Sequence, residues 1–191
     1  MKSLFNIVVL CSLIYEVILD GGCGLGFLKT PKRVLVQQEG ETSRFLKEEE
    51  WQPLRVHLDF SSIENNIGLY NKSDLIDLKE KIMPKTQNIF QNLLKVRRVS
   101  GKLKLNAPSC ETFPIPDIYH TEGIDADLVI FVLLDDSGYF AENSIEAAAI
   151  HCLQHQTTLR PVAGYIQFKQ DLKVDDSTAQ DYMIWLALHE I

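Results

Sequence analysis

The sequence predicts a mixed fold of the α/β or α+β class, in which helices pack on a β-sheet. Three observations carry the prediction: the alternating run "PLRVHLDF", the continuous apolar run "DLVIFVLL", and the apolar run "YMIWLAL" near the end of the chain. Alternation favours a strand with one buried face, and a short continuous apolar run favours a strand buried on both faces. The element order β, α, β, β, β, α indicates a layer of helices on a sheet.

The front of the chain reads as a secretion signal. One lysine precedes an apolar run from Leu4 to Tyr15, and small residues follow, so residues 1–22 are predicted to be a cleaved signal peptide. An uncleaved anchor or a buried helix is the alternative. Residues 23–50 are polar and irregular and read as a linker or pro-segment. The folded part, residues 51–191, is long enough for one domain. The mature protein is therefore expected to be secreted or on the cell surface.

The folded part is predicted to begin with a strand and a helix. Val56, Leu58 and Phe60 alternate with polar residues and predict a strand with one buried face. Proline suits the first turn of a helix but not its interior, so a helix is predicted to begin near Pro84. Its apolar stripe consists of Ile89, Phe90, Leu93 and Leu94.

The middle of the chain contains further strands. "VRRVSGKLKLN" predicts two short β segments around Ser100-Gly101, and its basic residues read as the solvated face of a hairpin or strand. Residues 127–134 predict a central strand, and "RPVAGYIQF" predicts another. The net charge of −7 weighs against nucleic acid as a partner, because binding phosphates needs clustered lysine and arginine.

The last predicted helix has a local cause for its start. Ser177 and Gln180 have the spacing of a capping box, with serine at the N-cap and glutamine three residues on. From Tyr182 to Leu188 the helix is apolar nearly all round, so it is expected to be buried on several sides. His189 and Glu190, at its far end, then lie next to the core.

His189-Glu190 is the start of the zinc-peptidase pattern H-E-x-x-H. In that pattern two histidines four residues apart bind one zinc ion, and the glutamate is the general base for the metal-bound water. The dipeptide alone is a weak signal. Its alternative is a polar pair at a helix end.

Four stretches in matching order strengthen the signal. They are "WQPLRVHLDF", "CETFPIPDIYHTEGIDADLVIFV", "HCLQHQTTLRPVAGYIQF" and "WLALHEI". Together they resemble the leishmanolysin family of secreted or surface zinc metalloendopeptidases, which are metzincins. The resemblance implies an α+β fold, a metzincin-like N-terminal subdomain with a twisted mixed sheet and packed helices. The last helix would be the start of the zinc-binding helix.

The resemblance also implies the chemistry. His189 is similar to the first zinc ligand and Glu190 to the catalytic base, zinc is the cofactor, and protein or peptide substrates are the partners. The remaining ligands, the Met-turn and the C-terminal region of the family do not follow Ile191, so we expect an inactive fragment. A secreted adhesion or binding module without catalysis is the alternative, and a truncated gene is a third. Membrane or surface association would involve parts outside this sequence.

Cysteines and a sequon fit an oxidising compartment. Cys110 and Cys152 are the economical disulfide pair because both lie in sequence that looks folded, and the resemblance supports the same pair. The family picture also favours an extended segment near Cys152 over the helix that its alanines suggest. Asn71 begins an N-x-Ser glycosylation sequon. Cys23 is either lost beside the signal peptide or a latency ligand for zinc.

Other polar residues have ordinary interpretations. His151 and His155 are spaced to share a metal only on a helix, and we expect ordinary surface histidines. His57 is expected on the polar face of its strand and His120 in a loop. Asp125 and Asp127 precede the central strand, where they are expected to cap a turn rather than bind calcium.

Overall fold

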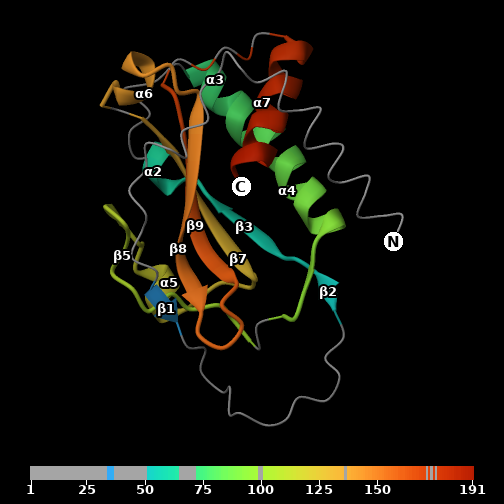
Figure 1. Cartoon of the computed structure of the whole chain (residues 1–191), viewed down its shortest axis with the longest axis vertical. Coiled ribbons are helices and arrows are strands. Elements are labelled where there is room, and N and C mark those ends of the chain that lie inside the picture. The colour runs from blue at the N-terminus through green and yellow to red at the C-terminus, as the bar shows by residue number, and fades with distance from the viewer. Residues whose placement is uncertain are drawn as a thin grey trace.

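A five-stranded mixed sheet organises the protein. The computed structural model describes residues 34–36, 51–64, 72–98, 101–135, 137–170, 172, 174 and 176–191. The strand order is β1-β8-β9-β7-β3, and the strands run over β1 (Val34–Val36), β3 (Val56–Asp59), β7 (Leu128–Leu134), β8 (Ala147–His155) and β9 (Pro161–Phe168) (Figure 1). β3, β7 and β9 are mutually parallel, whereas β8 runs antiparallel to β9. The predicted α+β class with a mixed sheet is confirmed.

The strands predicted from PLRVHLDF, DLVIFVLL and RPVAGYIQF are present as β3, β7 and β9. β7 lies between β9 and β3, and its residues alternate between two cores. Ile130 and Val132 join one core, and Val129 and Phe131 join the other. This explains its continuous apolar run, since a strand covered on both faces has no polar side. The extended interpretation of the segment around Cys152 is confirmed by β8. A short helix, α6 (Tyr139–Glu142), precedes it.

The prediction of two short β segments around Ser100-Gly101 is confirmed in part: a two-residue strand lies before this pair and an isolated bridge after it, but the two do not pair with each other. β4 (Lys95–Val96) pairs antiparallel with β2 (Gln52–Pro53), and beyond Gly101 the chain forms an isolated bridge between Leu103 and Ile124. The basic run is therefore not a hairpin. Its two parts pair with distant segments, and sequence periodicity does not reveal such partners. A second small ribbon joins β5 (Ser109–Cys110) to β6 (Phe113–Pro114).

The predicted helix start near Pro84 is confirmed by a helix that begins at Met83, but helical backbone also precedes it. Helical backbone begins at α3 (Lys72–Asp77) and continues through the π-helical turn η3 (Leu78–Ile82) into α4 (Met83–Leu93). In η3 the N–H of Met83 bonds to the carbonyl of Leu78, five residues back. A π turn directly before proline gives room for a residue that cannot donate a hydrogen bond and whose ring crowds the preceding turn. Pro84 thus lies inside a continuous helical segment.

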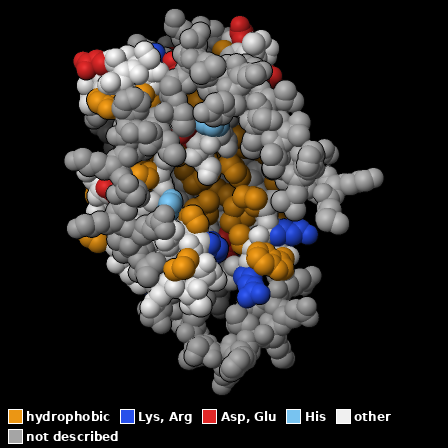
Figure 2. All heavy atoms as spheres, viewed as in Figure 1, with side chains coloured by type: hydrophobic (Ala, Val, Ile, Leu, Met, Phe, Trp, Pro, Cys, Tyr) orange, Lys and Arg blue, Asp and Glu red, His pale blue; other side chains and the backbone are white. Residues whose placement is uncertain are grey.

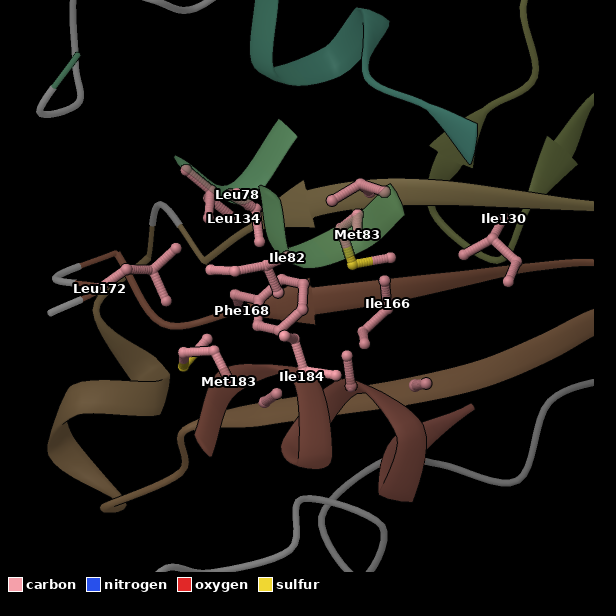
Figure 3. Close-up of a cluster of buried hydrophobic side chains, with 14 of the residues drawn as sticks. Leu78, Ile82, Met83, Ile130, Leu134, Ile166, Phe168, Leu172, Met183 and Ile184 are labelled. Carbon is pink, nitrogen blue, oxygen red and sulfur yellow. The ribbon is translucent and has the colours of Figure 1, made fainter. Parts of the chain in front are cut away.

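One core fills the space between the sheet and the helices. Leu78, Ile82 and Met83 come from η3 and α4, and they face Ile184 of α7 (Ser177–Glu190) across Phe168 of β9 (Figure 3). The same core takes in Ile89 and Phe90 of the predicted α4 stripe as partly buried residues. The stripe ends there, because Leu93 and Leu94 are 74% and 45% exposed.

A second core covers the opposite face of the sheet. It is built from the loop after Gly101, the β5–β6 ribbon and the short helix α5 (Ile118–Thr121), and it contains the buried ring of Tyr119. The Cys110–Cys152 disulfide lies in this core and joins the β5–β6 ribbon to β8. The expected pair is therefore bonded. Its sequence separation of 42 corresponds to about 4 kcal/mol in the chain-entropy estimate.

Several sequence predictions lie outside the described residues: the signal peptide at 1–22, Cys23 and the sequon at Asn71. Within the predicted linker or pro-segment, residues 34–36 are described, and they form β1 of the main sheet. A further short helix, α2 (Ser61–Glu64), follows β3. In the described part of the chain, each helix is too short or too polar to cross a bilayer.

Candidate active site

The helix α7 carries the candidate pair, and an aspartate sets its start. The Oδ1 atom of Asp176 accepts a hydrogen bond from the N–H of Ala179 at 2.8 Å, so Asp176 is the N-cap. The capping box predicted from Ser177 was wrong by one residue. Gln180, its other expected member, reaches the carbonyl of Val174 through Nε2 at 3.3 Å. Aspartate and serine are both good N-caps, and pattern alone could not choose between adjacent candidates.

Burial on α7 is one-sided, which corrects the expectation of burial on several sides. Met183, Ile184, Ala187 and Glu190 form the buried stripe, and the helix packs against α4, η3 and β8. The opposite side is open: Tyr182 is 51% and Trp185 64% exposed. Figure 2 shows hydrophobic side chains gathered in the centre of one face, where the C-terminus lies in Figure 1.

His189 and Glu190 lie on different sides of this helix. Neighbouring residues on an α-helix point about 100° apart. His189 is exposed and shares its side with Trp185, whereas Glu190 is 8% exposed and belongs to the buried stripe. An imidazole thus faces outward at the helix end, with a carboxylate beside it at the edge of the core.

The described residues do not by themselves fit a catalytic zinc ion. Such an ion takes three protein ligands and leaves one position for water. Within the described residues, no group of three or more His, Cys, Asp or Glu side chains could hold a metal ion. His189 could supply one ligand, and the other ligands would have to come from outside those residues.

The remaining histidines have structural roles. His151 and His155 lie on strand β8, where residues four apart are separated by about 13 Å, too far to share one ion. The Nδ1 atom of His155 accepts hydrogen bonds from the N–H groups of Thr157 and Thr158, both at 3.3 Å. Both ring nitrogens of His120 face carbonyl oxygens, those of Leu105 and Ile115.

His57 is less exposed to solvent than its place on the polar face of the strand predicts. Its ring packs edge-on against Tyr119, with the centroids 6.1 Å apart. Burial lowers the pKa of His57 below its usual 6.5, and the nearby charge of Asp59 only partly opposes this effect. The neutral form is therefore favoured in the folded protein.

An ion-pair cluster at the starts of β3 and β7 was not foreseen. Nε and Nη2 of Arg55 donate to the two carboxylate oxygens of Asp127, each at 3.0 Å, and the backbone N–H of Arg55 donates to the same carboxylate at 3.1 Å. Arg55 also pairs with Asp125. Both aspartates therefore bind an arginine, a partner that the expectation of a turn cap did not include. The sequence does show an arginine, Arg55, just before a predicted strand. It does not show which carboxylate the arginine binds, because Asp127 lies 72 residues further along the chain.

Aspartates also lie at the ends of two parallel strands, and both have structural roles. Asp59, at the end of β3, accepts from the N–H of Ser61 at 2.8 Å and from the hydroxyl of Tyr119. Asp135, after β7, accepts from the N–H groups of Ser137 at 3.1 Å and Phe140 at 2.7 Å. Their carboxylates are thus used to fix turns and a tyrosine.

The family model of leishmanolysin matches residues 69–191 of the chain, which is more than half of its length. No curated protein matches it. The matched stretch includes β7, β8, β9 and the whole of α7, which carry three of the four stretches on which the sequence resemblance rests; the fourth, WQPLRVHLDF, lies before it. The chain therefore belongs to the leishmanolysin family of zinc metallopeptidases.

Proposed function

We propose that this chain forms the N-terminal part of the catalytic domain of a secreted or cell-surface zinc metalloendopeptidase. One observation carries the proposal. A fourteen-residue helix packs one side on the sheet and ends with an exposed imidazole beside a buried carboxylate. A helix fixed in this way can hold a ligand and a base in one geometry.

In this proposal His189 is one zinc ligand and Glu190 is the general base. Zinc, when bound, would supply an activated water and polarise the peptide carbonyl. Glu190 would take the proton of the attacking water and later give it to the leaving amine. The remaining ligands are expected from chain beyond the described residues, and the substrates are proteins or peptides.

We also propose that the 191-residue chain by itself is catalytically inactive, because its described residues offer one zinc ligand where three are needed. One observation favours a second function, a secreted adhesion or binding module. The exposed aromatic rings of Tyr182 and Trp185 lie on the open side of α7, and such rings are enriched in protein interfaces. In that case α7 would be a contact surface and not a catalytic one.

Secretion belongs to the same proposal. The signal-like residues 1–22, the sequon at Asn71 and the Cys110–Cys152 disulfide all suit an oxidising compartment. Export of the chain from cultured eukaryotic cells, with a mass shift that Asn71→Gln removes, would support it. Retention in the cytosol would contradict it.

Zinc content and casein hydrolysis test the activity assignment for this chain alone. We expect less than stoichiometric zinc after dialysis and no cleavage of casein. Stoichiometric zinc that is lost in His189→Ala, but kept in the matched control His151→Ala, would show that the chain assembles its own site. Specific binding of a partner protein that Trp185→Ser weakens would favour the module instead.

A further inference from the structure

The basic run around β4 is a feature that the proposed function does not use. Residues 81–110 contain seven Lys and Arg residues and no Asp or Glu, although the whole chain has 26 acidic residues against 19 basic ones. Positive charge is therefore concentrated in one stretch of an acidic chain. A surface built from such a stretch attracts polyanions, because local charge and not net charge sets the potential that a large ligand meets.

The antiparallel ribbon of β2 and β4 gathers part of this charge on one face. Pro53 pairs with Lys95 across the ribbon. Alternate residues of a strand point to the same side, so Arg97 shares the face of Lys95, and by the same rule Trp51 shares the face of Pro53. All four residues are exposed. We call this surface, made of Trp51, Pro53, Lys95 and Arg97, the ribbon face. Figure 2 shows basic and hydrophobic side chains side by side where β2 lies in Figure 1.

On the ribbon face, Trp51 positions the guanidinium of Arg97. The Arg97 Cζ atom lies 5.7 Å from the centroid of the Trp51 ring, which is within cation–π range. A guanidinium that lies over a ring keeps the N–H groups along its edge available to an anion. Trp51 is itself 59% exposed, so the ring offers a flat apolar surface beside the charge.

The cations of the ribbon are available to an external anion. Among the described residues, no salt bridge involves Lys95, Arg97 or Lys102. Arg98 donates to the backbone oxygen of Pro53 at 3.4 Å, which does not neutralise its charge. A ligand with closely spaced anionic groups would therefore meet several cations without displacing a carboxylate of the described part of the chain.

The composition of the ribbon face favours a sulfated polysaccharide over a membrane. Guanidinium groups bind oxyanions through paired, charge-assisted hydrogen bonds, and sulfate esters stay ionised at physiological pH. A flat aromatic ring suits the face of a sugar ring. Insertion into a bilayer needs several large apolar side chains on one side, and the ribbon face has one aromatic ring. Leu94 does not add to it, because its carbonyl pairs with the N–H of the buried Leu54, which places Leu94 on the opposite face of the ribbon.

We propose that the ribbon face is a docking surface for a sulfated polysaccharide. Sulfate groups pair with Arg97 and Lys95, and a sugar ring lies on Trp51. Docking there holds the chain at cell surfaces or in matrices that contain such polymers. The inference goes beyond the proposed function and rests on it only in placing the chain outside the cell.

The first test measures the affinity of the full-length chain for a fluorescein-labelled heparin oligosaccharide by fluorescence polarisation. The double variant Lys95→Gln and Arg97→Gln should bind at least about tenfold more weakly, because each cation contributes a charge-assisted contact. The matched control Lys79→Gln and Lys81→Gln removes the same charge from η3 and should have a much smaller effect. Absence of binding by the unchanged chain, or equal weakening in the two double variants, would overturn the proposal.

The second test examines which groups are recognised. Arg97→Lys keeps the charge but loses the planar guanidinium, and Trp51→Leu keeps an apolar side chain but loses the ring. Each should weaken heparin binding severalfold without lowering the melting temperature, since both side chains are exposed. Chemically desulfated heparin should not bind. Equal affinity for sulfated and desulfated heparin would refute recognition of sulfate.

Vesicles that contain phosphatidylserine separate this proposal from binding to a membrane. Leu93, which is 74% exposed at the end of α4, is the nearby apolar side chain that a bilayer would engage. Leu93→Ser should leave the heparin affinity unchanged. Sedimentation of the chain with vesicles that Leu93→Ser abolishes, together with no heparin binding, would replace the polysaccharide by a lipid surface. None of these measurements needs zinc or hydrolysis, so failure of the peptidase assignment remains distinguishable.

Discussion

Arg55 joins the starts of β3 and β7 through a carboxylate that solvent does not reach. The side chain of Asp127 has 0% exposure, while that of Asp125 is 77% exposed. A buried carboxylate needs its partner, because an unpaired charge away from water is costly. Loss of the buried salt bridge between Arg55 and Asp127 should therefore lower the free energy of unfolding much more than loss of the exposed one between Arg55 and Asp125.

Replacing Arg55 with methionine should lower the free energy of unfolding by about 3 to 5 kcal/mol, since Asp127 then loses its buried ionic partner. Asp125→Asn, which breaks the exposed pair, should cost less than about 1 kcal/mol. Urea unfolding followed by circular dichroism measures both. Losses of similar size in the two variants would contradict this assignment of the buried pair.

His57 should make stability depend on pH. Its pKa is lowered in the folded state, so below about pH 6.5 the unfolded chain binds more protons than the folded one. Its contribution is therefore present above that pH and is lost as the pH falls. His57→Gln should flatten the acid side of the curve of unfolding free energy against pH. An NMR titration of the folded protein placing the His57 pKa above 6.5 would refute this.

At the scale of elements, two kinds of interaction hold α7: a side-chain cap at its start and packing of one side against the core. Asp176 caps the start, and the stripe from Met183 to Glu190 packs the rest on α4, η3 and β8. The cap satisfies one of the N–H groups that a helix start leaves without partners. Packing supplies the direction of the helix, and hence the positions of His189 and Glu190.

Asp176→Ala should destabilise the protein by about 1 kcal/mol, the usual cost of losing an N-cap side chain. Ser177→Ala removes the residue that the sequence pattern favoured and should have a much smaller effect. Thermal unfolding of the two variants side by side gives the comparison. The reverse order would mean that Ser177, and not Asp176, caps the helix.

Local sequence was sufficient to predict the strands and helices that bury apolar residues in a regular pattern. β7, β9 and α7 are such elements, because their cause lies within a few adjacent residues. Local sequence could not predict contacts between segments far apart in the chain, such as the pairing of β4 with β2 or the ion pair of Arg55 with Asp127. Pro84 marked the start of α4, but local sequence did not reveal the helical segment before it, because the π turn that joins the two depends on the packing of Leu78 and Ile82 in the core. For the candidate site, the pattern supplied the pair His189-Glu190 but not the side of the helix on which each residue lies.

At the scale of the whole molecule, the open side of α7 is exposed apolar surface. Burying a large apolar side chain stabilises a protein by roughly 1.5 to 3 kcal/mol, and that contribution is missing for an exposed ring. Trp185 and Tyr182 are both more than half exposed. We therefore expect the isolated chain to associate with itself or with a partner.

Trp185→Ser should reduce self-association of the purified chain, measured by sedimentation velocity at several concentrations. Leu159→Ser is the matched control, since Leu159 is 58% exposed but lies in the turn between β8 and β9. It should leave the association unchanged. A monomeric chain at all concentrations would instead show that this surface does not drive association.

The most direct test of the peptidase assignment joins this chain at Ile191 to the C-terminal region of a leishmanolysin-family peptidase and measures bound zinc and casein hydrolysis together. We predict stoichiometric zinc and chelator-sensitive hydrolysis. Glu190→Ala should abolish hydrolysis but retain zinc, His189→Ala should lose both, and the exposed carboxylate variant Asp181→Ala should keep both. Full hydrolysis by Glu190→Ala, or full zinc content in His189→Ala, would contradict the roles proposed for these residues.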